Sequence, residues 1–207
     1  MRYKNLAIAT LLFCIPVGIV FGVNQRSDNR LFLDRRKEAN HYLDKAEAII
    51  ADGSYAPIYE NKNGEKEEFI NLVNKSLKLE ETAKAYLYLG IVGHMSFDAS
   101  GYKEAVDNYG KAIELNPEYM RAYIALAATH LNNKNYKGCI HRSEQALKVD
   151  PQNQTVKEQH KRCTYFLNQR NFHECTSDAD KKKLLINSKN KVVLEKINEC
   201  MAQLERK

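Results

Sequence analysis

Residues 101–151 read GYKEAVDNYGKAIELNPEYMRAYIALAATHLNNKNYKGCIHRSEQALKVDP, and this stretch decides the fold. Two phrases recur in it. The phrase GYKEA at 101–105 returns as NYKGC at 135–139, so the two tyrosines stand 34 residues apart. The phrase AIELNP at 112–117 returns as ALKVDP at 146–151, again after 34 residues. A shared period of this length predicts stacked helical hairpins.

The residue types at these positions agree with a hairpin repeat. Small residues on one helix face let two helices approach closely, and tyrosine or phenylalanine fills the wedge between successive pairs. Pro117 and Pro151 each stand where a helix has to end before the next one begins. A third copy of the aromatic phrase, NFHEC at 171–175, follows the second after 36 residues.

Other helices are expected on both sides of the repeats. Upstream, 35–51 and 67–80 carry apolar stripes at helical spacing, and 52–66 reads as a long polar loop. Downstream, 154–168 is amphipathic, whereas 172–186 matches the repeat only at its aromatic and cysteine positions. A final stripe through 191–204 predicts a helix with a polar outer face, which suits the end of a repeat array.

The two units in which these phrases recur resemble the tetratricopeptide repeat (TPR) family. The family pattern is an aromatic, Leu-Gly, an aromatic, Ala, an aromatic, Ala and Pro over two antiparallel helices. In the first unit the matching residues are Tyr86, Leu89, Gly90, Ala105, Tyr109, Ala112 and Pro117. In the second they are Tyr123, Leu126, Ala127, His130, Cys139, Ser143, Ala146 and Pro151. The first unit is longer by three residues, which we place in the loop between its helices, around 94–100.

The resemblance implies an all-α fold, a short TPR-type α-solenoid of about three helix pairs with capping helices, preceded by an N-terminal hydrophobic helix. We expect a signal anchor or signal peptide at 1–23, a basic linker at 24–38 and a divergent helical pair at 39–82. Two firm repeats follow at 83–153, and a degenerate repeat with a C-terminal capping helix at 154–207.

The N-terminus carries an uncharged run, LAIATLLFCIPVGIVFGV, at residues 6–23. Its length lies between that of a signal-peptide core and that of a membrane span. Gly18 and Gly22 have the spacing that lets two spanning helices approach closely, but small residues also occur beside cleavage sites. We expect membrane association through residues 6–23, with a retained anchor and a cleaved signal as the two alternatives.

The orientation of this segment is open in the sequence. Arg2 and Lys4 precede the run, and five further basic residues lie between 26 and 37. The larger downstream cluster favours the cytoplasm, whereas the signal-like features favour export. We expect the soluble part on the exported or periplasmic side, with the cytoplasmic orientation as the alternative.

Four cysteines lie outside the run: Cys139, Cys163, Cys175 and Cys200. Their spacing fits no zinc pattern, because paired C-x₂₋₄-C ligands are missing. Cys139 and Cys175 fall where the family places alanine, so we expect buried structural thiols. In an oxidising compartment Cys163 on a neighbouring helix can reach one of these two, and four cysteines allow three disulfide connectivities.

Composition and motifs exclude several classes of function. The chain has 43% hydrophobic residues, 28% charged residues and no tryptophan, and its nine glycines and four prolines are too few for a β-sandwich. The formal net charge is +6, and it is too dispersed for nucleic-acid binding. No serine-hydrolase, zinc-protease, P-loop or dinucleotide motif occurs. We therefore expect no enzyme activity, metal, cofactor, nucleic acid or small-molecule substrate, and interpret His130 as a packed or hydrogen-bonded core histidine.

The family resemblance also implies a concave groove lined by the first helix of each pair. Carried over by position, the groove residues are Lys84, Leu87, Tyr88, Ile91, Arg121, Ile124, Ala128, Glu158, Arg162 and Tyr165, with Ala125 and Gln159 beside them. Ile124 and Ala125 stand where a clamp for a C-terminal carboxylate needs polar groups, so that binding mode is not expected.

The function we expect is a membrane-associated scaffold that binds a peptide or a partner helix of an unidentified protein in this groove. Two alternatives come from other classes. One is a structural subunit of a membrane complex. The other is an exported thiol or redox protein that uses Cys163 and Cys175.

Overall fold

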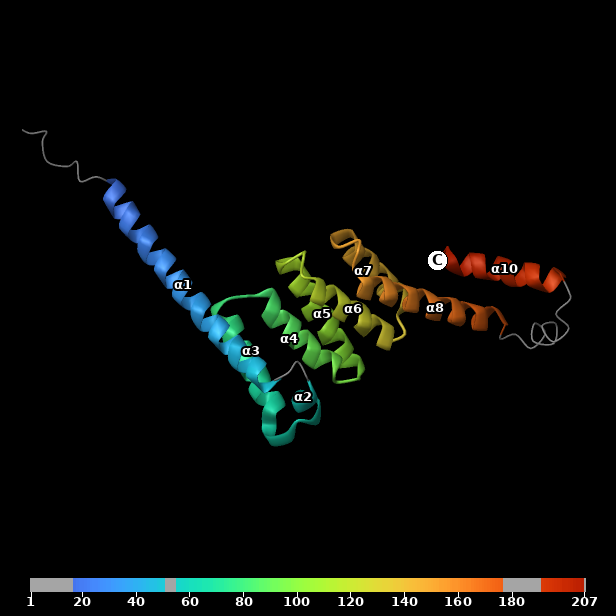
Figure 1. Cartoon of the computed structure of the whole chain (residues 1–207), viewed down its shortest axis with the longest axis horizontal. Helices are drawn as coiled ribbons and strands as arrows, with labels where there is room; N and C mark the ends of the chain where they lie inside the picture. The colour runs from blue at the N-terminus through green and yellow to red at the C-terminus, as the bar shows by residue number, and fades with distance from the viewer. Residues whose placement is uncertain (1–16, 51–54, 177–190, 207) are drawn as a thin grey trace, which may run out of the picture. The chain divides into compact units, whose positions relative to one another are not determined.

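The computed structural model describes residues 17–50, 55–176 and 191–206, and all regular structure in these ranges is helical (Figure 1). In chain order the elements are α1 (Val17–Ile49), α2 (Ala56–Glu60), the 3-10 helix η2 (Lys62–Gly64), α3 (Glu65–Leu79), α4 (Ala83–His94), α5 (Ala99–Leu115), α6 (Met120–Asn132), α7 (Tyr136–Val149), α8 (Gln154–Thr176) and α10 (Lys191–Glu205). The expected all-α fold class is confirmed. The helices belong to two compact units, one with α1, η2 and α3, and one with α4 to α8 and α10.

The first unit is built from one face of α1 packed on α3. On α1 the buried positions Ala39, Leu43 and Ala46 are three or four residues apart, so they share one helix face. On α3 the matching face carries Phe69 and Val73, both fully buried. The unit is therefore a helical hairpin with a narrow apolar seam.

Helix α1 continues through residues 24–38, which the sequence analysis assigned to a basic linker. The physical reason is composition, because no glycine or proline occurs between Gly22 and Gly53 and residues 24–38 include four arginines and two leucines, which are good helix formers. Residues 1–16 of the expected hydrophobic segment lie outside the described residues, and 17–23 form the start of α1. None of the helices in the described ranges combines the length and the apolar character that a membrane crossing needs.

The segment expected as a polar loop at 52–66 contains α2 and η2. Pro57 lies in the first turn of α2, where its missing N–H is not needed. The chain then reverses through Asn61, Asn63 and Gly64, which have φ values of 46°, 58° and 77°. Asparagine and glycine tolerate this left-handed region best, which explains why the reversal falls here.

The second unit begins with two helical hairpins, α4 with α5 and α6 with α7, that have the same turn geometry. The side chain of Asp98 accepts a hydrogen bond from the Gly101 amide at 2.7 Å and caps α5. Asn135 caps α7 in the same way, through the Gly138 amide at 3.0 Å. The residue before each cap is left-handed, with φ of 53° at Phe97 and 57° at Lys134.

The three extra residues of the first hairpin lie at the expected place, around 94–100, but they lengthen helix α5 and not the loop before it. The turn at 95–98 is only one residue longer than the turn at 133–135. Helix α5 has 17 residues, whereas α7 has 14. Asp98 caps α5 at the beginning of this additional turn, so the insertion is stabilised as helix.

The interiors of the two hairpins are filled in complementary ways. In the first, Gly90 lies against the ring of Tyr109, and a Cβ atom at position 90 would come within 2.5 Å of two ring carbons. Tyr109 is fully buried and packs with Leu87, Ala105 and Leu126. At the equivalent positions the second hairpin has Ala127 and Ser143, both fully buried. A smaller side chain on the second helix therefore accompanies a larger one on the first.

Helix α8 runs unbroken to Thr176, so the phrase at 171–175 does not open a new helix as its likeness to the two earlier phrases suggested. No glycine or proline follows Pro151, and nothing in the sequence stops the helix near Asn171. Residues 177–186 of the expected helix at 172–186 fall outside the described residues. Helix α10 covers the predicted C-terminal helix and is joined to α8 by a disulfide between Cys175 and Cys200.

Candidate functional site

The residues predicted to line a groove lie on α4 and α6, which are the first helices of the two hairpins, and on α8, which follows the second hairpin. Helix α6 contacts both α4 and α8, so the three helices form one continuous layer (Figure 1). The exposed members of the predicted set are Arg121, Glu158, Arg162 and Tyr165. The half-buried members are Lys84, Ile91, Ile124 and Ala128.

Two of the predicted groove residues are not open to a ligand. Leu87 and Tyr88 are each only 1% exposed. Leu87 packs against Ala105 and Tyr109 in the core of the first hairpin, because the small residues of α5 let it reach inward. The ammonium of Lys84 lies 5.9 Å from the centre of the Tyr88 ring. The family pattern, carried over by position, placed Leu87 in the groove, whereas the structure buries its side chain.

Gln159, the neighbour of Glu158 on α8, joins two of the groove helices. Its amide nitrogen donates to the carbonyl oxygen of Ile124 at 3.0 Å. Ile124 itself packs on the cluster of Tyr123, Ala146 and Val156. The bond fixes the spacing of α6 and α8, so Gln159 acts as a structural contact rather than a ligand contact.

Near the turns of the two hairpins, His94 is held between α4 and α6. The Thr129 hydroxyl donates to the carbonyl oxygen of Ala125 at 2.8 Å, so it accepts from the Nδ1–H of His94. The other ring nitrogen, Nε2, then accepts from the amide of Asn132 at 3.0 Å. This arrangement suits the neutral ring, and burial lowers the pKa of His94.

His130 forms a second polar contact between the hairpins, and it is a buried, hydrogen-bonded core histidine as predicted. Its Nδ1 lies 3.0 Å from the Tyr102 hydroxyl and 3.4 Å from the amide nitrogen of Asn135. The Asn135 oxygen is taken by the Gly138 amide, so its nitrogen points as a donor toward the ring. Burial, together with the positive charges of Arg142 and His141, lowers the pKa of His130 to about 4.

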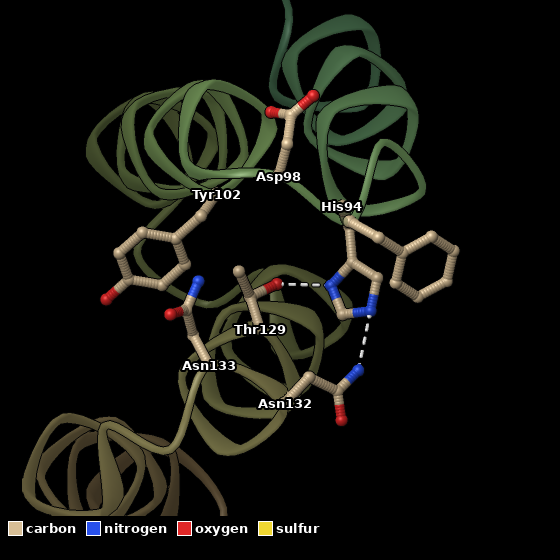
Figure 2. Close-up of a pocket in the computed structure, with 7 residues that line it drawn as sticks. His94, Asp98, Tyr102, Thr129, Asn132 and Asn133 are labelled. Atoms are coloured by element: carbon tan, nitrogen blue, oxygen red, sulfur yellow. Dashed lines mark hydrogen bonds between the residues drawn. The ribbon is translucent and has the colours of Figure 1, made fainter.

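A hollow of about 80 Å³ opens between the ends of α4, α5 and α6. Figure 2 shows the rings of His94 and Tyr102 on opposite sides of Thr129, with the Asp98 carboxylate directed away from Thr129. The space accommodates a few water molecules or one small group. We assign it no ligand, because His94, Thr129 and Asn132 in its wall are already hydrogen-bonded to one another.

Sequence reasoning missed this group of contacts around His94. Thr129 and Asn132 are 35 and 38 residues from His94, so no local spacing brings them together. The available signal was weak, namely a histidine in the last turn of the first helix of both hairpins, at His94 and His130.

The four described cysteines form two disulfides, so the expectation of buried free thiols is wrong. Cys139 on α7 pairs with Cys163 on α8, and Cys175 pairs with Cys200. Both Cα–Cα distances are 6.0 Å. Cys139 takes the place of a small residue at the tight helix contact, and its sulfur faces α8, where Cys163 lies. Cys163 and Cys175, named together in the redox alternative, are bonded to different partners.

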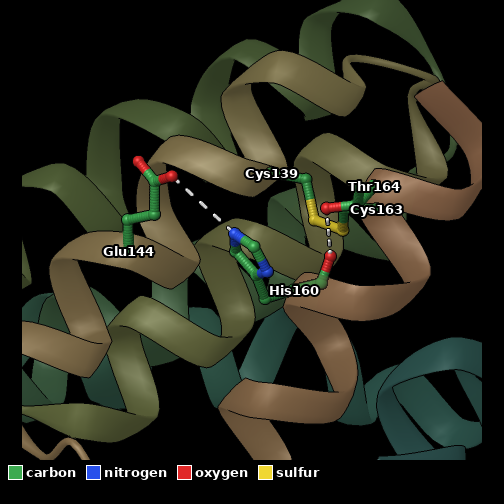
Figure 3. Close-up of polar contacts among 5 residues, drawn as sticks. All are labelled: Cys139, Glu144, His160, Cys163 and Thr164. Atoms are coloured by element: carbon green, nitrogen blue, oxygen red, sulfur yellow. Dashed lines mark hydrogen bonds and ion pairs between the residues drawn. A yellow bond between two sulfur atoms is a disulfide. The ribbon is translucent and has the colours of Figure 1, made fainter. Parts of the chain in front are cut away.

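The first disulfide lies beside a polar contact of the same two helices (Figure 3). His160 Nε2 is 3.7 Å from a carboxylate oxygen of Glu144, which joins α8 to α7 on their surface. The Thr164 hydroxyl donates to the carbonyl oxygen of His160 at 3.0 Å within α8. The disulfide therefore links α7 and α8 covalently within their contact.

Comparison with known proteins agrees with this geometry. A family model described as the TPR repeat matches residues 93–134, from the end of α4 through α5 and α6 to the following turn. A search of the curated proteins found no match. The matched residues include Ala105, Tyr109, Ala112 and Pro117, which carried the sequence resemblance. Their helices form antiparallel hairpins in the expected order, and residues 93–134 of the chain are similar to the tetratricopeptide repeat.

Proposed function

We propose that this protein is a scaffold that binds a segment of a partner protein along the layer formed by α4, α6 and α8, and that its role is binding rather than catalysis. The observation that carries the proposal is the continuity of this layer across the two hairpins and the following helix α8. Stacked helical hairpins present extended surfaces of this kind. Extended peptides and amphipathic helices are the partners that such surfaces accommodate.

The side chains along the layer favour a protein ligand. The middle is apolar, with half-buried Ile91, Ile124 and Ala128, and exposed Arg121 and Arg162 stand along it. Apolar anchors with charges around them are typical of specific protein interfaces. Leu87 and Tyr88, which are buried, are left out of this surface.

Crosslinked co-purification from native membranes tests the proposal. The full chain is compared with the double variant Arg121→Glu and Ala128→Gln, which changes charge and volume seven residues apart on one face of α6. We expect a defined set of proteins to be recovered with the wild type and to fall at least fivefold with the variant. The matched control is Lys148→Glu, an exposed charge reversal on α7.

Equal loss with Lys148→Glu, or full recovery with the α6 double variant, would overturn the groove assignment. Circular dichroism of each variant verifies that helix content is unchanged. A purified partner then allows the same comparison in vitro, where the expected change is in the dissociation rate.

We further propose that residues 6–23 tether the chain to a membrane with the helical part on the exported side. The uncharged run supports the tether, and the two disulfides support the compartment, because such bonds persist where the environment is oxidising. Thiol labelling in intact cells with and without prior reduction tests this. We expect four residues to become reactive only after reduction. Four thiols that react without reductant would place the helical part in the cytoplasm.

A further inference from the structure

A cluster of aromatic rings with one guanidinium lies where α7 meets α8. We call it the Tyr136 cluster, and its members are Tyr136, Tyr165, Phe166 and Arg170. The rings of Tyr136 and Phe166 are stacked, with centroids 5.9 Å apart and planes at 19°. Tyr165 meets Phe166 edge-on at 5.5 Å, and the guanidinium carbon of Arg170 lies 5.3 Å from the centre of the Tyr136 ring.

The corresponding tyrosine of the first hairpin has a different environment. Tyr102 lies 34 residues before Tyr136, and its hydroxyl is bound by His130 and Asn135 inside the helix stack. Tyr136 instead faces Phe166, which remains 38% exposed, and the adjoining Tyr165 is 58% exposed. Two aromatic side chains on one turn of α8 thus contact their neighbours and still present much of their surface to water.

The cluster is held on a rigid base. The disulfide between Cys139 and Cys163 joins α7 to α8, and each cysteine is three residues from a stacked ring, Tyr136 on one helix and Phe166 on the other. Residues three apart on a helix are neighbours, so the covalent bond lies directly beneath the stack. A surface whose rings are already positioned loses little conformational entropy on binding.

The charge beside the cluster is mainly positive, with Glu158 and Glu174 at the two ends of a basic stretch of α8. From Gln159 to Asn171, α8 carries Lys161, Arg162 and Arg170, all exposed, and no aspartate or glutamate. Lys137, next to Tyr136 on α7, is also exposed. A guanidinium over an aromatic ring keeps its N–H edges available for carboxylates. The chemistry complementary to this surface is therefore negative charge combined with apolar side chains.

We propose that the Tyr136 cluster is a docking surface for an acidic segment of a partner protein, with carboxylates bound by Arg162 and Arg170 and an apolar side chain placed on Tyr165 and Phe166. The proposal rests on the proposed function and names the chemistry of the partner at the α8 end of the binding layer. Aromatic and arginine side chains are the residue types that most often dominate protein interfaces.

Selection from a random library of eight-residue peptides tests this, with the disulfide-bonded full chain as the target. We expect peptides bound by the wild type to contain at least threefold more aspartate and glutamate than the starting library. The enrichment is expected to disappear on the double variant Tyr165→Ala and Arg170→Gln, and to persist on the control Lys148→Gln. Intact disulfides and unchanged helix content verify that each target is folded.

Fluorescence anisotropy with the most enriched peptide then measures affinity. We expect the dissociation constant to rise at least fivefold with the double variant and to rise when salt is increased from 50 to 200 mM, as screened charges require. Replacing the acidic residues of the peptide by their amides is expected to weaken binding at least tenfold. A ten-residue oligouridine RNA serves as competitor, because stacked rings with cations also suit single-stranded nucleic acid.

Three results would overturn the proposal. They are selected peptides without acidic enrichment, enrichment that persists on the double variant, and tighter binding of the RNA than of the peptide. The first leaves the proposed function intact, since peptides are still bound. A wild-type chain that selects no peptide contradicts both proposals together.

Discussion

The two hairpins α4–α5 and α6–α7 share a backbone but differ in nearly every side chain that fills it. Both turns use a left-handed residue followed by a capping Asp or Asn, and both hairpins end before a proline. Inside, the pair Gly90 and Tyr109 is replaced by Ala127 and Ser143. The comparison teaches that the repeat is defined by its turn geometry rather than by residue identity at each buried position.

The largest expected difference in stability between the hairpins is at the buried position of the second helix, which is Tyr109 in the first hairpin and Ser143 in the second. Tyr109→Ala removes a fully buried ring and should lower the free energy of unfolding by about 3–5 kcal/mol. Ser143→Ala removes a buried hydroxyl that has no hydrogen-bond partner among the described residues, so it should change stability by less than about 0.5 kcal/mol. Urea unfolding of the two variants measures both values. Similar losses would show that the interiors are not complementary.

At Gly90, which faces the ring of Tyr109, the effect of a substitution on stability is expected to change sign with the residue at position 109. Gly90→Ala should destabilise the wild type by about 1–3 kcal/mol, because the new Cβ would overlap the Tyr109 ring. In a Tyr109→Ser background the same change should stabilise by about 0.5–1 kcal/mol, since alanine is the better helix former. A double-mutant cycle in urea measures the coupling. Equal effects in both backgrounds would contradict the packing described for Gly90.

In the second hairpin His130 should make the stability depend on pH. The equivalent position of the first hairpin is Gly93, which cannot titrate. The pKa of His130 is lowered from 6.5 to about 4, so between these values the unfolded chain binds more protons. Stability is therefore greatest above pH 6.5 and falls as the pH drops toward 4, by about 1–2 kcal/mol after allowance for water near the ring.

Thermal unfolding from pH 7.5 to 4.5 tests this, with His130→Gln as the comparison. The variant keeps an acceptor for Tyr102 but cannot titrate, so its melting temperature should fall less over the same range. His94, whose pKa is also lowered, contributes in the same direction in both proteins. Parallel curves for the two proteins would rule out the role given to His130.

The smallest expected effects are at the turns, where the hairpins are alike. Lys134→Gly and Phe97→Gly both relieve a left-handed side chain and should each raise stability by up to about 1 kcal/mol. Differential scanning calorimetry resolves such changes. A loss of stability at either position would show that its side chain makes a contact that offsets the backbone strain.

The parts of the fold that the sequence predicted are those fixed by local chemistry. Pro117, Pro151 and the repeated aromatic phrases mark the helix ends between Ala83 and Asn153, and these helices are present. The continuation of α1 through 24–38 and of α8 past Asn171 was missed. At 24–38 the charged residues resemble a linker, and at 171–175 the phrase NFHEC resembles the beginning of a new helix. In both places only the absence of glycine and proline reveals the continuous helix.

The site was less predictable, because its members meet through packing between helices. The family pattern, carried over by position, put Leu87 in the groove, but Leu87 is buried against Ala105 and Tyr109 of α5. The partners of His94 and the pairing of Cys139 with Cys163 come from positions more than 20 residues away. Local periodicity contains no information about such pairs.

Site-specific photocrosslinking tests the central claim, that the α4–α6–α8 layer binds a partner protein, most directly. A photoreactive phenylalanine is placed at position 121 or 128 on α6 and, as the control, at the exposed position 107 on α5. After irradiation of intact cells we predict a crosslinked species of one defined mass from positions 121 and 128 and none from position 107. Crosslinks from position 107 alone, or the same products from all three positions, would contradict the account.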